Sequence, residues 1–361
     1  MTNSAMPPDV VFTTLTKIKD SPNNKVKDIE KIFAAVNDHG SNAQISFLKA
    51  IDRSIGSYAH IQGIVAYRIR ATASNVVAVD WNAEKVGSIV SAAAAQTGTS
   101  ADPLPTFSST QQIYTTFPFP DNESYIRGKH PGGLQTCGDI IVSAVEGVEG
   151  QANAWFNFHL INDKTGEITN LKHTVTIAPK ASTAGLVWFK KHYIVAIARE
   201  GSIIDIYTQA DSQDIYQPGG ALKHCASWNL KDQPAKTGRS DWAPNKEWRG
   251  VEGGGNLFVS QNKLYFIAFQ REKDLSGADW ACLYRLNFDP DQVSNSFTIT
   301  KCAERHLIFE GGGGFGPHCR WGASANISDN GNSMSFAVTS RGTKDLGRKS
   351  INTPSLISFC W

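Results

Sequence analysis

Short runs in which apolar and polar residues alternate cover most of the chain, which is the pattern of half-buried β-strands. Turn residues separate the runs, and the runs recur in the same order. The second runs of the series lie at residues 76–79, 139–145, 192–197, 263–269 and 334–338. Third runs, with alternating aromatic residues, lie at 154–158, 202–207, 282–288 and 355–361. The pattern predicts an all-β chain built from repeated units of about four short antiparallel strands.

The N-terminal part of the chain follows a different pattern. Apolar residues recur at helical spacing in 24–36 and again in 42–55, which predicts two short amphipathic helices. The chain is therefore expected to consist of an N-terminal helical segment, residues 1–56, and a β-domain, residues 57–361. The helices either cap one end of the β-domain or pack on its outer flank. Because both the last run and residues 9–12 are largely apolar, the two chain ends are expected to complete one unit together.

One short motif precedes each unit: a polar residue, here called the marker residue, and a glycine three positions later, the marker glycine. In the first four units these pairs are His60–Gly63, His130–Gly133, Ser182–Gly185 and Glu252–Gly255. In the fifth unit the marker glycine is Gly322, and the marker residue is Cys319 or, with one residue inserted, His318. The marker glycines are 70, 52, 70 and 67 residues apart, which suits units of four short strands.

Five such units in succession resemble the five-bladed β-propeller, in which twisted sheets, the blades, surround a central axis and expose few strand edges. The resemblance covers residues 57–361 and rests on period and strand order. The long interval after Asp80 leaves open a sixth, degenerate blade within 82–128, although residues 96–112 are typical of a long loop. In a propeller the first strand of each blade lines the axis. The marker residues are therefore predicted to form one ring, and the glycines to give the crowded backbones room.

Imidazoles and a carboxylate in one ring form a typical set of metal ligands. We predict a divalent transition metal, Zn, Fe, Mn or Cu, held by His60, His130, Glu252 and His318. A thiolate from Cys319 in the fifth position would favour Zn or Cu. Resemblance to metal-bearing propellers, in which histidines of different blades hold one ion on the axis, implies the same arrangement.

The metal is predicted to act as a Lewis acid or to activate water or dioxygen. Glu252 would be a metal ligand or the general base, and Ser182 or Arg320 would orient the substrate. Gln135 and Asn256, which follow two of the marker glycines, are expected to orient the imidazoles.

Other functions remain open. The ring residues can cap turns and line a polar, water-filled channel in a carbohydrate-binding or scaffolding propeller without catalysis. Five-bladed propellers also include furanosidases, but glycoside hydrolysis needs two carboxylates and the ring contains only Glu252. The strong divergence of the blades favours one central site over a separate sugar site in each blade.

The composition excludes some partners. The chain of 361 residues has a net charge of +2, from 35 Lys and Arg against 33 Asp and Glu, so neither nucleic acid nor a membrane is expected as partner. A small molecule or a glycan is expected instead. The N-terminus lacks the pattern of a secretory signal, which predicts a cytoplasmic location. Six cysteines occur without any CxxC spacing, and Cys282 and Cys302 are left open as a disulfide between neighbouring strands.

Overall fold

The computed structural model describes the backbone of most strands and of one N-terminal segment. The described residues are 16–43, 60–69, 74–83, 86–96, 107–108, 114–118, 130–146, 154–161, 168–177, 181–199, 201–210, 222–230, 251–271, 278–292, 298–309, 319, 322–339 and 356–359. Side chains are described for 16–40, 132–145, 154, 156–161, 181–199, 201–209, 222–230, 251, 253–270, 279–292, 298–308, 319 and 322–339.

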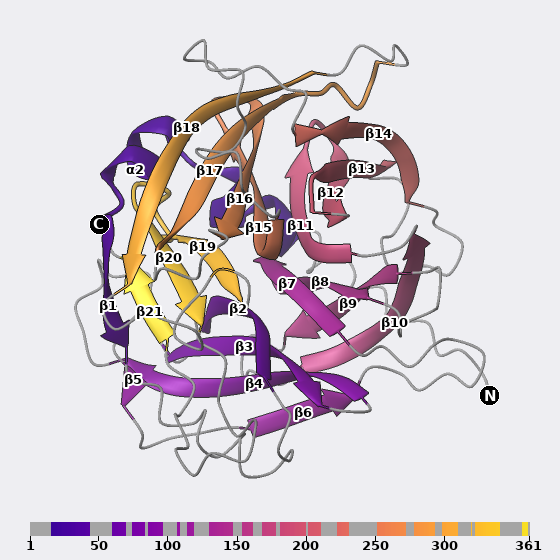
Figure 1. Ribbon diagram of the computed structural model, residues 1–361. Coiled ribbons are helices and arrows are strands. Elements are labelled where there is room, and N and C mark those ends of the chain that lie inside the picture. Colours follow the sequence, from indigo (N-terminus) through magenta and orange to yellow (C-terminus); the bar gives the residue numbers. More distant parts are fainter. Residues whose placement is uncertain are drawn as a thin grey trace, which may run out of the picture.

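The strands form five antiparallel blades, one after another along the chain (Figure 1). Blade 1 contains β2 (His60–Ile69), β3 (Ser74–Ala83) and β4 (Val86–Gln96), with β5 (Phe107–Ser108) and β6 (Tyr114–Pro118). Blade 2 contains β7 (His130–Cys137), β8 (Ile140–Glu146), β9 (Ala154–Ile161) and β10 (Ile168–Ile177). Blade 3 contains β11 (Ala181–Phe189), β12 (His192–Arg199), β13 (Ile203–Ala210) and β14 (Lys223–Asn229). Blade 4 contains β15 (Val251–Ser260), β16 (Lys263–Arg271), β17 (Ala278–Asn287) and β18 (Thr298–Phe309). Blade 5 contains β19 (Ala323–Ile327), β20 (Met334–Thr339), β21 (Leu356–Phe359) and β1 (His39–Ala43).

The first strands of the blades close a ring around the axis. β2 contacts β7, β7 contacts β11, β11 contacts β15, β15 contacts β19, and β19 contacts β2. The protein is therefore an all-β, five-bladed propeller with a short N-terminal helical segment, as the sequence predicts. The alternative of a sixth blade is wrong for the described part of 82–128, because β5 and β6 both pair with β4 inside blade 1.

An N-terminal strand completes the last blade. β1 pairs with β21 in antiparallel register, with Ser41 opposite Ser358, and also touches β18 of blade 4 through a short parallel pairing at His39. In Figure 1 the indigo β1 lies beside the yellow β21. A segment from the N-terminal part of the chain thus completes the last blade, as expected in outline, but the prediction for residues 9–12 stays untested. The strand is 39–43, whereas residues 9–12 lie outside the described residues.

Only the first of the two predicted helices is confirmed. Helix α2 (Ile29–Ala35) follows the short 3-10 turn η1 (Pro22–Asn24), and the Asp28 side chain caps it by accepting a hydrogen bond from Lys31 N. The start of the second predicted helix is wrong, because residues 42–43 belong to β1. They form a strand since the open edge of β21 offers backbone partners that outweigh local helical spacing. Residues 44–55 lie outside the described residues.

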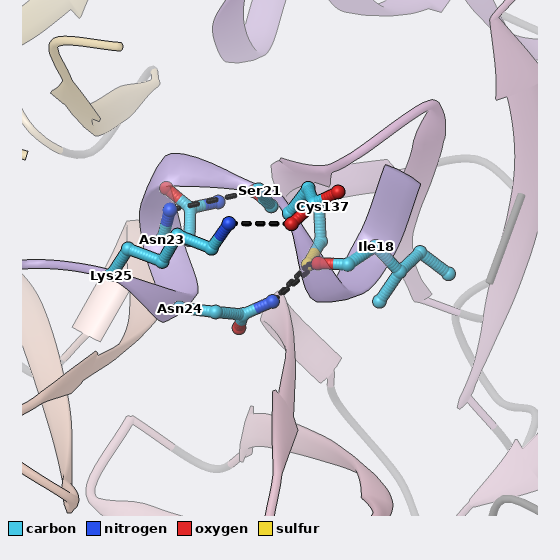
Figure 2. Close-up of polar contacts among 7 residues, drawn as sticks. Ile18, Ser21, Asn23, Asn24, Lys25 and Cys137 are labelled. Carbon is cyan, nitrogen blue, oxygen red and sulfur yellow. Dashed lines mark hydrogen bonds and ion pairs between the residues drawn. The ribbon is translucent and has the colours of Figure 1, made fainter. Parts of the chain in front are cut away.

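The N-terminal segment lies across the end of the propeller at which the inner strands finish. Asn23 donates to Thr136 O at the end of β7. Asn24 donates to Ile18 O and to Cys137 Sγ, and Figure 2 shows these three residues together. Asn24 also accepts a hydrogen bond from Trp188 N in β11, at 2.9 Å. Farther along, Val26 N donates to Val259 O in β15 at 3.1 Å. The 3-10 turn and the residues around it therefore cap the end opposite the marker residues, whereas α2 also lies against β18, the outer strand of blade 4, so each expected arrangement is found in part.

Hydrophobic clusters join blades 2 to 5 in pairs. Three separate clusters lie between blades 2 and 3, 3 and 4, and 4 and 5. Cys282 belongs to the second and Cys302 to the third, so their side chains leave blade 4 on opposite faces and cannot form a disulfide; both are free thiols. Among the described residues no helix is long and apolar enough to cross a membrane.

Candidate axial site

The inner strands bend where the marker residues lie. Register shifts interrupt the pairing of the first and second strands in blades 1 to 4, between Ile61 and Gly63, Pro131 and Leu134, Ala181 and Thr183, and Val251 and Gly255. β7 and β11 are parallel neighbours, with Gly133 opposite Thr183, so the bends lie at the same end of the ring. Bulges of this kind increase twist and redirect side chains, and they are common beside functional sites.

Glycines let the inner strands touch one another directly below the marker residues. A Cβ atom on Gly132 would lie 2.2 Å from Ser182 O, and one on Gly133 would lie 2.9 Å from Gly253 O. On the other side, a Cβ atom on Gly254 would lie 2.2 Å from Ala323 O. The predicted reason for the glycines, crowding of backbones near the axis, is confirmed. Blades 2, 3, 4 and 5 meet here with backbone against backbone.

Just beyond the bends, two buried amide side chains form hydrogen bonds between neighbouring inner strands. Gln135 Oε1 accepts hydrogen bonds from Leu186 N at 3.0 Å and Leu257 N at 2.8 Å, and its Nε2 donates to Leu257 O at 2.7 Å. Asn256 Oδ1 accepts from Ala325 N at 2.8 Å. The prediction that these amides orient imidazoles finds no support in these contacts. They satisfy backbone groups of Leu186, Leu257 and Ala325, on inner-strand edges beyond the short pairing of β7 with β11.

The predicted site residues are placed in part. The backbones of His60, His130 and Glu252 lie in the inner strands β2, β7 and β15, at the bent end. Their side chains, and both His318 and Arg320, lie outside the described residues. The predicted metal site is therefore untested. Among the side chains that the structure describes, no three of His, Cys, Asp or Glu gather as a metal site requires.

Ser182 and Cys319 can be followed to their side chains. Ser182 is partly exposed, and its hydroxyl donates to Ala198 O in β12 at 3.1 Å. Cys319 is 1% exposed. Burial first, and then the neighbouring charge of Asp279, raise the pKa of the Cys319 thiol well above its usual range.

Two charged groups near this end were not selected from the sequence. Arg199, the last residue of β12, pairs with Ala181 beside Ser182, and its Nε forms an ion pair with the buried Asp205. Asp279, near the start of β17, is fully buried and accepts a hydrogen bond from Cys319 N. The available signal was a charged residue at the end of an otherwise apolar run. That signal is weak, because such residues also occur at ordinary turns.

At this end of the axis the structure describes the Ser182 hydroxyl and the backbones of His60, His130 and Glu252. Below them, backbone contacts and amide side chains occupy the ring. The Ser182 hydroxyl is a group that can take part in hydrogen bonds to a polar molecule.

Comparison with solved structures finds similar chains at low sequence identity. The chain is similar to the GH43_1 enzyme from Xanthomonas citri, with a TM-score of 0.46, 8% identity, and coverage of 88% of this chain and 93% of that one. It is also similar to the GH43 endo-arabinanase from Bacillus licheniformis (0.45, 11% identity, 84% and 95% coverage). For the Trypanosoma rangeli sialidase the values are 0.43, 7%, 85% and 46%. No model of a known protein family matches the sequence, and no curated protein sequence matches it either.

Proposed function

We propose that the protein binds one polyhydroxylated small molecule, a glycan or a glycan fragment, at the bent ends of its inner strands. The observation that carries this proposal is the convergence of those ends: blades 2, 3 and 4 touch at glycines immediately below their marker residues. His130 precedes Gly132 by two residues, roughly 7 Å of strand. Ser182 is itself the residue that Gly132 touches, and Glu252 adjoins Gly253.

The residue types at these positions suit sugar hydroxyl groups. An imidazole, a serine hydroxyl and a carboxylate can each accept a hydrogen bond from a ligand, and the first two can also donate one. Because the marker residues are not the same in all five blades, being histidine in blades 1 and 2, serine in blade 3 and glutamate in blade 4, they form an asymmetric set that supports one site per chain. Five equivalent sites would need five similar sets.

The test is calorimetric titration with named sugars. Xylotriose and sialic acid are suitable probes, since the X. citri enzyme has been solved with xylotriose and the sialidase with sialic acid. Wild type is expected to bind one equivalent of a sugar, and His130→Ala is expected to weaken binding by about tenfold or more, because it removes a central hydrogen-bonding group. His192→Ala is the matched control, since His192 begins β12 at the opposite end of blade 3. Equal binding by both variants, or several equivalents per chain, would contradict the proposal.

A bound transition metal is a second candidate. It is favoured by one observation, that His60, His130 and Glu252 occupy the same bent end of three inner strands. In this case His60, His130, Glu252 and His318 would bind the ion, Glu252 could instead serve as general base, and Ser182 or Arg320 would orient the substrate. Metal analysis of untagged protein decides between the two: one equivalent of Zn, Fe, Mn or Cu, lost in His130→Ala and kept in His192→Ala, supports the metal site. A metal-free wild type that binds sugar supports the glycan site alone.

A further inference from the structure

We propose that Asp279 is a positioning residue of the axial site: its buried carboxylate fixes the segment that contains the fifth marker position. This inference rests on the proposed function, because it concerns the same site. It adds a residue from the third strand of blade 4, which is not an inner strand and which contains no marker motif.

Asp279 lies at the same end of the propeller as the marker residues. In blade 4, Gln270 pairs with Val251 of the inner strand and with Trp280 of β17, so these residues form one row across the sheet. Asp279 is in the next row outward toward that end. Its side chain is fully buried and turns toward blade 5, because Ala281, two residues later, belongs to the cluster between blades 4 and 5.

The carboxylate holds Cys319 directly. Cys319 N donates to Asp279 Oδ2 at 2.5 Å, across a separation of 40 residues in the chain. Hydrogen bonds to an ionised acceptor are shorter and about twice as strong as neutral ones. A single buried carboxylate thus holds the backbone of a residue 40 positions away in the chain.

The residues that follow Cys319 are held by other contacts. Gly322 O accepts hydrogen bonds from Thr339 N at 2.9 Å and from the Thr339 hydroxyl at 3.3 Å, inside blade 5. The backbone of Ala323 lies against Gly254 of the inner strand of blade 4. Asp279 therefore holds the backbone at Cys319, on the N-terminal side of these contacts. His318 and Arg320 are the chain neighbours of Cys319. Because consecutive Cα atoms are about 3.8 Å apart, the position of Cys319 limits the positions of both residues.

The proposed role requires a hydrogen-bond acceptor, and preferably a charged one, at position 279. Alanine removes the acceptor completely and leaves a buried N–H group without its partner. Asparagine keeps one oxygen that can accept the hydrogen bond from Cys319 N but loses the charge. A positioning role therefore predicts a graded series, in which Asp279→Asn retains part of what Asp279→Ala loses.

Asp205→Asn is the matched control. Asp205 is also a buried aspartate on the third strand of its blade, at the same end of the propeller, and is 3% exposed. Its partners Arg199, Ser227 and His224 all belong to blade 3. This variant should lose stability by a similar amount without affecting the segment around Cys319.

The experiment combines hydrogen exchange with sugar titration on the full chain. In Asp279→Ala, peptides that cover residues 317–323 should exchange about tenfold faster or more, with an intermediate rate in Asp279→Asn and an unchanged rate in Asp205→Asn. The affinity for whichever of xylotriose and sialic acid binds wild type should fall in Asp279→Ala and fall less in Asp279→Asn, while Asp205→Asn controls for the exchange rates alone. Unchanged exchange in Asp279→Ala overturns the proposal, and so does faster exchange with unchanged affinity. If wild type binds no sugar and no metal, the proposed function fails, and with it the role of Asp279 in the site. The exchange rates then still test whether the hydrogen bond from Cys319 N to Asp279 holds this segment.

Discussion

Acidification is expected to destabilise the protein through one buried histidine. His159 lies in β9 on the face of blade 2 that turns away from blade 3, is 1% exposed, and has its Nε2 3.4 Å from Ser143 Oγ. Burial lowers the pKa of His159 from 6.5 to about 3, because an imidazolium ion would lose its hydration there. The ring is therefore neutral in the folded protein at pH values at which it is protonated in the unfolded chain.

The size of the effect follows from the two pKa values. Between pH 6.5 and pH 3 the unfolded chain binds the additional proton, so the free energy of unfolding falls as the pH is lowered through this window. At pH 5 the loss is about 2 kcal/mol, and near pH 4 it is about 3 kcal/mol. At pH 7 it is only about 0.2 kcal/mol, because the unfolded imidazole is then mostly neutral as well.

Equilibrium unfolding in guanidinium chloride at pH 7 and pH 5, followed by tryptophan fluorescence and circular dichroism, measures this loss. His159→Gln is the matched variant, because it keeps a hydrogen-bonding side chain near Ser143 and has no group that titrates in this range. Between the two pH values, wild type should lose about 2 kcal/mol more than the variant. Carboxylates that titrate in both proteins cancel in the difference. An equal loss in the two proteins would refute the reasoning, since it would mean that His159 is not buried in its neutral form.

Two further predictions concern the end of the propeller opposite the marker residues. Asn24→Ala should lower the free energy of unfolding by about 1–3 kcal/mol, because it leaves Trp188 N without its partner and removes one of the hydrogen bonds to Ile18 O; Lys31→Ala, exposed in α2, is the control for chemical unfolding. A loss below about 0.5 kcal/mol would mean that the N-terminal cap contributes little. Lys191→Gly should raise the free energy of unfolding by about 0.5–1 kcal/mol, because Lys191 has a φ of 64° in the β11–β12 turn. Lys263→Gly, at an exposed strand position, should lower it, and a loss in both variants would contradict the explanation by backbone strain.

The fold could be predicted from the sequence because each blade repeats the same local signals. A marker glycine, an apolar second strand and an aromatic third strand recur at nearly constant intervals, and sheets of this kind bury both faces only by stacking around an axis. β1 could not be found in this way. Its sequence, His-Gly-Ser-Asn-Ala, has low β propensity, and it becomes a strand only because β21 presents an unpaired edge.

The candidate site was predicted in position more than in detail. The marker glycines indicated backbones in contact; Gly133 and Gly185 do lie against the backbone of blade 4, whereas Gly255 lies against side chains of Phe266 and Thr183. The roles of Gln135 and Asn256 were assigned from proximity in sequence, which does not reveal that the inner strands have free edges to satisfy. Asp279 could not be chosen at all, since its contact with Cys319 joins residues 40 positions apart in different blades.

The use of the axis for structural bonds restricts where this propeller can bind a ligand. Gln135 joins β7 to β11 and β15, and Asn256 joins β15 to β19, so four of the five inner strands have their free edges engaged along this stretch. The opposite end carries the N-terminal segment, whose Asn24 and Val26 bond to the ends of β11 and β15. A ligand that reaches the described inner strands therefore approaches from the bent ends. Specificity then depends on the few side chains there, which is why single substitutions at His130 and Asp279 are expected to separate binding from folding.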